Sequence, residues 1–157
     1  MELLEKHHHL ENLKMIISIL EKNFISSKKI MDELESLAKS EEECLSVKPE
    51  LLESASDFCK EFIKRMSFFE TSFLMFTVDD NVLRSEVLSI LSSLKDESNF
   101  LSEKINEFKQ IDSDDSEDYK NGLFDIVYSY GALAGLFSEL SKYIESTFTK
   151  SKTFSLN

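Results

Sequence analysis

The sequence predicts an all-α protein that folds as an elongated antiparallel four-helix bundle of up-down-up-down order. Three observations lead to this prediction. Apolar residues recur along four segments at alternating spacings of three and four, which is the period of an amphipathic helix. One proline and three glycines in 157 residues leave few places for tight turns. The connectors between the segments are short, and the length suits one domain over residues 1–157.

The first helix is predicted over about 2–44. Its apolar seam comprises Leu10, Leu13, Ile17, Leu20, Phe24, Ser27, Met31, Leu34 and Ala38, with Ser27 as the one polar member. Pro49 suits the first turn of a following helix and therefore ends this one. Because the first helix is the longest, two alternatives are open: its N-terminal end extends past the bundle and pairs with a second chain, or it breaks near Ser26–Ser27.

The second and third helices are predicted over about 49–76 and 78–110. The second carries Ala55, Cys59, Phe62, Met66, Phe69, Phe73 and Phe76 on one stripe, which we expect to form the aromatic centre of the core. Thr77 and Asp80 fit a capping box at the start of the third helix. The third helix carries Val87, Leu91, Leu94, Ser98, Leu101, Ile105 and Phe108.

The fourth helix is predicted over about 117–149, after an acidic connector. Its apolar arc comprises Leu123, Ile126, Val127, Tyr130, Leu133, Ala134, Phe137, Leu140, Ile144 and Phe148. The tail, residues 151–157, is expected to fray, since chain ends are poorly ordered unless something ties them down.

Charge and composition exclude several classes of partner. The formal net charge is −12 and no basic run is longer than two residues, as in Lys28-Lys29, so we expect no nucleic-acid binding. Lys64, Arg65 and Glu70 interrupt the most apolar stretch, which predicts no membrane insertion.

Neither Cys44 nor Cys59 has the spacing of a disulfide framework or metal site, and the start of the chain is charged. We therefore expect reduced thiols, Cys59 in the core, and a cytoplasmic location.

Nothing in the sequence predicts an enzyme. It contains no GxSxG turn and no glycine-rich phosphate loop, and its three histidines, residues 7–9, are adjacent. We expect no catalytic residue and no cofactor. The one metal-like fragment is Glu5 with His8, at the i, i+3 spacing of diiron carboxylate bundles, but such a site needs a second Glu-x-x-His pair. Only a symmetric dimer brings two such fragments together, so we expect a solvated N-terminal turn and no metal site, with Glu5 and His8 as the alternative.

Two glycines in the fourth helix mark a candidate binding face. Phe124, Tyr128, Gly131 and Gly135 fall on one stripe outside the core arc, and each glycine costs a helix about 1 kcal/mol relative to alanine. A close backbone approach is a compensating contact. The approaching group is either a neighbouring helix of the same bundle, an external partner or a small molecule.

The second helix offers a parallel case in Phe68 and Met75. These residues lie seven apart on the side opposite the core seam. If the helix is enclosed by others they belong to the core; if not, they form an aromatic and methionine patch of the kind that adaptable binding surfaces use. Either this patch or the glycine stripe is also able to close a homodimer.

These features predict a non-enzymatic protein–protein interaction module: an adaptor, a chaperone-like binder or an assembly subunit that uses exposed apolar helix faces. The acidic surface favours a basic or amphipathic helical partner segment, laid helix-in-groove. The alternative is a metal- or small-ligand-binding helical bundle, which rests on Glu5, His8 and the two glycines.

Overall fold

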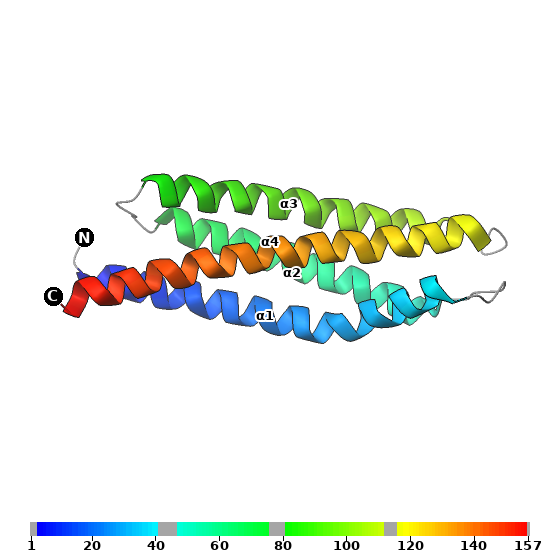
Figure 1. Cartoon of the computed structure of the whole chain (residues 1–157), viewed down its shortest axis with the longest axis horizontal. Coiled ribbons are helices and arrows are strands. Elements are labelled where there is room, and N and C mark those ends of the chain that lie inside the picture. Colours follow the sequence, from blue (N-terminus) through cyan, green and yellow to red (C-terminus); the bar gives the residue numbers. More distant parts are fainter. Residues whose placement is uncertain (1–2, 41–46, 76–80, 112–115, 157) are drawn as a thin grey trace.

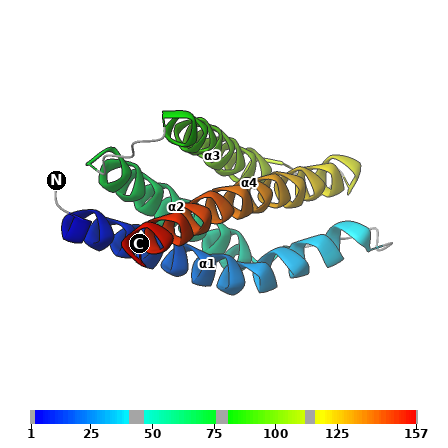
Figure 2. The ribbon, with the colours of Figure 1, turned by 60° about the vertical axis from the view of Figure 1, so that its left-hand side comes forward.

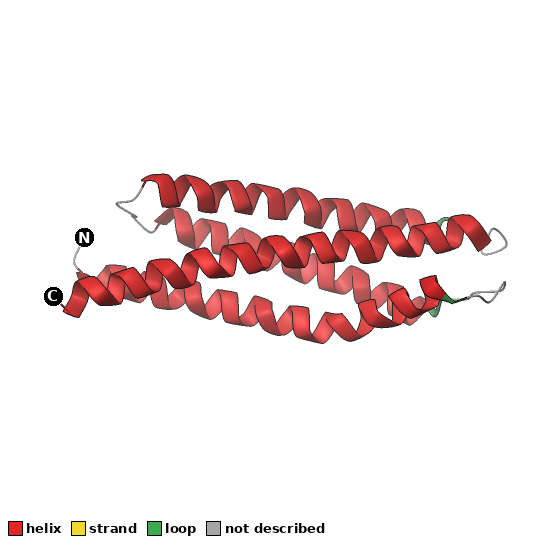
Figure 3. Cartoon of the chain, in the orientation of Figure 1, coloured by secondary structure: helices red, strands yellow, loops and turns green. Residues whose placement is uncertain are grey.

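The computed structural model describes residues 3–40, 47–75, 81–111 and 116–156. Side chains are not described at 3–7, 9, 83, 116 and 147–156. The described chain forms four helices, α1 (Leu3–Lys39), α2 (Pro49–Met75), α3 (Asn81–Lys109) and α4 (Ser116–Leu156), and no strand (Figure 3). The prediction of an all-α four-helix protein is therefore confirmed.

Each helix packs against two others and keeps one outer side. The backbone of helix α1 lies against α2 and α4, and that of α3 lies against the same two helices. Described side chains of α2 and α4 also meet across the core, since the ring centroids of Phe58 and Tyr130 are 5.7 Å apart. Figures 1 and 2 show the four helices running along one long axis, with both termini at the same end. This packing is that of a bundle, so binding surfaces have to lie on the outer sides or in the seams between neighbouring helices.

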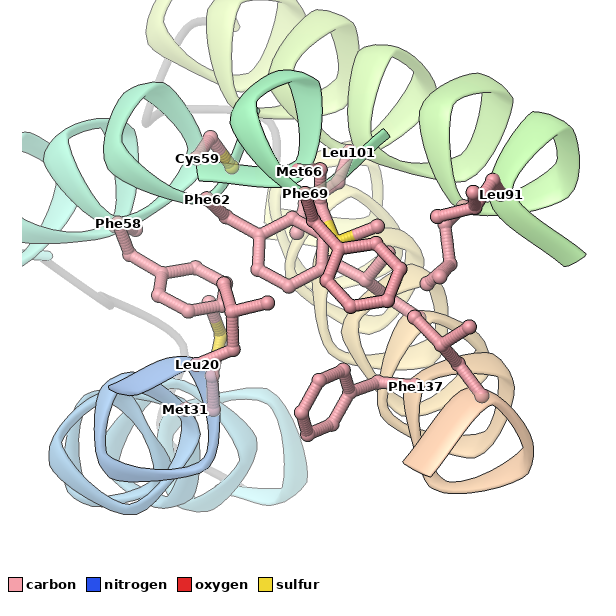
Figure 4. Packing of buried hydrophobic residues seen from close by; sticks show 14 of the residues in the cluster. Leu20, Met31, Phe58, Cys59, Phe62, Met66, Phe69, Leu91, Leu101 and Phe137 are labelled. Carbon is pink, nitrogen blue, oxygen red and sulfur yellow. The ribbon is translucent and has the colours of Figure 1, made fainter. Parts of the chain in front are cut away.

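The predicted apolar stripes form the core. Every predicted seam residue of α1 is buried except Phe24, which is half-buried. Phe24 stands at the aromatic centre, with ring centroids 5.3 Å from both Phe58 and Phe62 and 5.0 Å from Phe137. Figure 4 shows Phe62 and Phe69 from α2 and Phe137 from α4 pointing into the space between the helices. Aromatic pairs at these separations add about 0.5–1.5 kcal/mol to the energy of burial.

The polar residue in the α1 seam has a structural partner. Ser27 is buried, its Oγ donates to the Phe24 carbonyl at 3.0 Å, and the same Oγ lies 2.9 Å from Tyr130 Oη. Helix α1 continues through this position, so the alternative of a break near Ser26–Ser27 is wrong.

Leu10 and Leu13 are also buried, so α1 is covered from Leu10 onward and no overhang begins there.

Two helix ends differ from the prediction. The first helix was expected to reach Cys44, but α1 ends at Lys39, and Ser40 N donates to the Leu37 carbonyl at 3.2 Å in a tightened last turn. The fourth was expected to end near 149, yet α4 continues to Leu156. Residues 150–156 hold no proline or glycine, so the backbone chemistry does not end the helix there.

Several predicted features lie outside the described residues. These are Cys44, the capping box of Thr77 and Asp80, and Phe76; the side chain of Phe148 is also not described. The remaining predicted stripe residues of α2 and α3 are all buried.

Candidate functional site

The outer side of α4 carries the predicted glycine stripe, which we call the α4 glycine face: Phe124, Tyr128, Gly131 and Gly135. Phe124 is 43% exposed and Tyr128 is 82% exposed. A Cβ added at Gly131 or Gly135 would meet no atom within 4 Å, and neither residue has a positive φ. Among the described residues no helix is therefore seated on these glycines, and the alternative that the notch serves packing inside the bundle is wrong.

The third glycine, Gly122, is the one that makes a close approach. A Cβ there would lie 2.8 Å from Phe108 Cδ2 and 3.0 Å from Ile111 Cδ1. Gly122 therefore allows α4 to approach the end of α3. Sequence reasoning missed this role, although the spacing offered a signal, because Gly122 follows Tyr119 by three and precedes Ile126 by four on the core-facing side of the helix.

The outer side of α2 carries Phe68 and Met75, which we call the α2 outer stripe. Phe68 is 64% exposed and Met75 is 65% exposed. The packing explains this exposure, since the neighbours of α2 within the described chain are α1 and α3, and its side facing away from the core is uncovered. The alternative in which both residues belong to the core is therefore wrong.

Beside the α2 outer stripe lies a hollow in the seam between the first two helices, which we call the α1–α2 groove. It has a volume of about 600 Å³; α1 lines it with Met15, Ile16 and Ile19, and α2 with Phe68, Lys64 and Arg65 among others. Met15, Ile19 and Phe68 are exposed. The predicted site residues included Phe68 but not the α1 wall. The segment 15–20, MIISIL, held the signal, since it is too apolar for a single seam to use all of it.

The groove has a cationic edge in an acidic protein. The guanidinium of Arg65 donates to Asn23 Oδ1 at 3.2 Å, and its Nε lies 3.5 Å from Glu61 Oε2. These contacts hold Arg65 at the seam. Lys64 is exposed and makes no salt bridge within the part of the chain described. The amide nitrogen of Asn23 is buried without a hydrogen-bond partner among the described residues.

The α1–α2 groove brings Phe68 together with the α1 residues, and Met75 continues the same face of α2 two turns beyond Phe68. The α4 glycine face lies elsewhere, because α4 and α2 are not neighbouring helices and meet in the described chain through core rings such as Phe137 and Phe62. The six predicted site residues therefore form two separate surfaces.

The structure also describes two of the residues considered for metal binding or thiol chemistry, His8 and Cys59. His8 is exposed, and the side chain of Glu5 lies outside the described residues. No three His, Cys, Asp or Glu side chains of the described part cluster in a metal-binding arrangement. Cys59 is buried as predicted, and burial raises the pKa of its thiol from 9.0 to about 12. A thiol with so high a pKa is not a reactive nucleophile near neutral pH.

None of the described helices combines the length and apolar character that crossing a membrane requires. No known protein family, curated protein or solved structure matches the chain. The physical character of the two surfaces is therefore the basis for a functional proposal.

Proposed function

We propose that the chain is a non-enzymatic protein–protein interaction module that presents exposed apolar helix faces to another protein. The observation that carries this proposal is the exposure of Phe68, Met75, Phe124 and Tyr128, which are among the large apolar side chains that the described part of the chain leaves exposed. Single exposed apolar residues are normal on proteins, but apolar groups gathered beside a groove are typical of binding sites. An adaptor, a chaperone-like binder or an assembly subunit would use such surfaces.

The proposal includes an antiparallel up-down-up-down order within one domain of residues 1–157. Contacts between neighbouring helices support this order. On α2 and α3, Lys95 pairs with Glu70 and Lys109 with Glu53, so rising numbers on one helix match falling numbers on the other. On α4 and α1, Tyr130 meets Ser27 and Ser141 meets Glu21 in the same sense. The order leaves four outer sides, two of which carry the apolar surfaces.

The partner class we propose is a protein with an amphipathic helical segment, laid against an apolar face. Recognition of this kind uses apolar anchors at helical spacing. Because the net charge is −12, most of the surface attracts a basic partner segment. A second copy of the chain is the competing occupant. The cytoplasm is the proposed location, because the buried Cys59 thiol belongs to a fold that needs no disulfide.

The test is to capture a partner on the purified chain, produce that partner separately and measure its affinity. We expect either Phe68→Ser or Tyr128→Ser to weaken binding at least about tenfold, as truncation of an aromatic anchor does. Circular dichroism should be unchanged, because both side chains are largely exposed. Gly131→Leu fills an open position and should abolish binding if the partner uses the α4 glycine face. A partner that binds the double variant Phe68→Ser/Tyr128→Ser with unchanged affinity contradicts the proposal.

The competing class, a metal-binding bundle, has its own test. Elemental analysis of protein purified without a tag should find no stoichiometric iron or zinc. If it finds one metal per chain, and His8→Ala removes that metal, metal binding replaces protein interaction as the function of this chain.

A further inference from the structure

We propose that the α1–α2 groove binds an amphipathic helix of another protein whose apolar anchors are flanked by carboxylates. This inference rests on the proposed interaction function and deepens it, because it assigns the site and the charge of the partner segment. The assigned charge is opposite to the one that the net charge of the whole chain favours.

The first step is the shape and chemistry of the groove. Met15 and Ile19 stand one helical turn apart on α1, opposite Phe68 on α2, and Ile16 forms the wall beneath them. Together they line a space of about 600 Å³. Methionine adapts to different shapes and phenylalanine contributes a rigid apolar surface, so the lining suits side chains of leucine or phenylalanine size. Apolar anchors on one face of a partner helix fit this space.

The second step is charge. The chain carries 30 acidic and 18 basic residues, yet the lining of the groove includes Lys64 and Arg65 and no carboxylate. Arg65 already has Glu61 as a partner, whereas Lys64 makes no salt bridge to any described residue. Exposed cations beside an apolar surface attract carboxylates and repel cations. A flanking glutamate or aspartate of the partner helix would pair with Lys64.

The third step is the extent of the seam. The next hollow along it, of about 210 Å³, is lined by Asn23, Ser26, Asp57 and Glu61 among others, so the lining changes from cationic to acidic. From Met15 to Ile30 the two hollows span about 22 Å of α1 at 1.5 Å per residue. A partner helix of about 16 residues would cover both. Only its part over the apolar hollow should carry the flanking carboxylates.

The experiment uses three display libraries of helical peptides of about 16 residues, a length set by the helical rise. All vary the apolar face, and the flanking positions are fixed as glutamate, lysine or glutamine. We select on the full chain and synthesise the strongest binder of each library with one tryptophan. Because the protein has no tryptophan, peptide fluorescence reports binding directly.

We expect the glutamate-flanked peptide to bind most tightly. Phe68→Ser should weaken the affinity for this peptide at least about tenfold, which is the usual cost of removing an anchor. Lys64→Glu should invert the preference, so that the lysine-flanked peptide binds most tightly. Ile25→Ser is the matched control, since Ile25 is 74% exposed on α1 but does not line the groove, and it should change nothing. Circular dichroism of each variant should match that of the unaltered chain.

Four results would overturn the inference. A preference for lysine flanks on the unaltered chain contradicts the assigned charge, and failure of all three libraries contradicts a helical occupant. Binders that respond to Tyr128→Ser but not to Phe68→Ser place the site on the α4 glycine face, which leaves the proposed function standing. A dimer seen by light scattering that Phe68→Ser dissociates makes a second copy the occupant. The proposed function itself fails only in its own partner-capture test.

Discussion

Gly122, Gly131 and Gly135 lie in the same helix, but an added methyl group meets very different surroundings at each. At Gly131 and Gly135 it meets open space, and alanine is favoured over glycine in a helix by about 1 kcal/mol. We therefore expect Gly131→Ala and Gly135→Ala each to raise the free energy of unfolding by about 0.5–1 kcal/mol. Urea denaturation followed by circular dichroism measures this change.

Gly122→Ala is the matched control within the same helix. Its methyl group would lie 2.8 Å from a buried Phe108 ring, which is itself packed 4.6 Å from the Tyr119 ring. We expect this variant to lose about 1 kcal/mol or more, since overpacking a core costs about 1–3 kcal/mol and the gain in helix propensity offsets part of it. A loss of stability at Gly131 or Gly135 as large as that at Gly122 would show that the α4 glycine face is not open.

Cys59 gives a second prediction at the scale of a single residue. Its thiol should resist modification at neutral pH in the folded protein, because burial raises its pKa to about 12 and hides the sulfur. In a Cys44→Ser background, labelling should proceed only as fast as the protein unfolds. Rapid labelling of the native protein would contradict the buried position.

The same pKa shift predicts how stability depends on pH. The unfolded thiol ionises near its ordinary pKa of 9.0, whereas the folded thiol stays neutral up to about 12. The contribution of Cys59 is therefore fully present below pH 9.0 and is lost as the pH rises from 9.0 toward 12. Cys59→Ala should flatten the pH dependence of the unfolding free energy in this window when compared with the unaltered chain.

At the scale of the elements, the contact between α1 and α4 is both apolar and polar. Ser27 Oγ and Tyr130 Oη lie 2.9 Å apart, and they lie 3.0 and 3.1 Å from the Phe24 carbonyl oxygen. We expect a double-mutant cycle of Ser27→Ala and Tyr130→Phe to give a coupling energy of about 0.5–1.5 kcal/mol, because one interhelical hydrogen bond is shared by both residues. Denaturant titrations of the four proteins measure it.

Ser98 serves as the control for this cycle. It is also buried in a predicted stripe, but its Oγ donates at 2.6 Å to the Leu94 carbonyl of its own helix. Ser98→Ala combined with Tyr130→Phe should therefore be additive within about 0.5 kcal/mol. A coupling of equal size in both cycles would mean that the Ser27–Tyr130 contact is not specific.

The helices could be predicted from the sequence because one period governs each apolar stripe, from Leu10 to Ala38 in α1 and from Val87 to Phe108 in α3. The hydrogen-bond partner of a buried polar residue could not be predicted in this way. Ser27 is recognisable as a break in the stripe, but its pairing with Tyr130 depends on which helices become neighbours. The end of α1 was also missed, because α1 ends without a proline or glycine, in a last turn where Ser40 N donates to the Leu37 carbonyl.

The candidate site was predictable in part for the same reason. A helical wheel separates Phe68, Met75 and the α4 glycine face from the core stripe, and all of these residues are exposed. A groove needs two helices, and the wheel of one helix cannot place Met15 and Ile19 beside Phe68. Their register across the seam is set by the packing of α1 on α2.

At the scale of the whole molecule, the bundle exposes more surface than a compact protein of its size. Its accessible surface is 9614 Å², whereas a monomer of 18.1 kDa typically has about 8,100 Å². An elongated shape accounts for the excess, since the helices lie along one axis (Figure 1). Such a shape places many exposed carboxylates along four outer sides.

The charge on this surface leads to the last prediction. The chain has a net charge of −12, and its excess negative charges repel one another in the folded state. Salt screens that repulsion, because the Debye length falls from about 30 Å at 0.01 M to about 10 Å at 0.1 M. Ion pairs such as Lys39–Glu35 are exposed and contribute little that salt can remove. We therefore expect sodium chloride over this range to raise the Tm by about 2–4 °C, equivalent to about 1 kcal/mol. In the double variant Glu103→Gln/Asp125→Asn, which removes two exposed charges, the rise should be smaller. A Tm that falls with added salt would mean that the exposed ion pairs outweigh the repulsion between carboxylates.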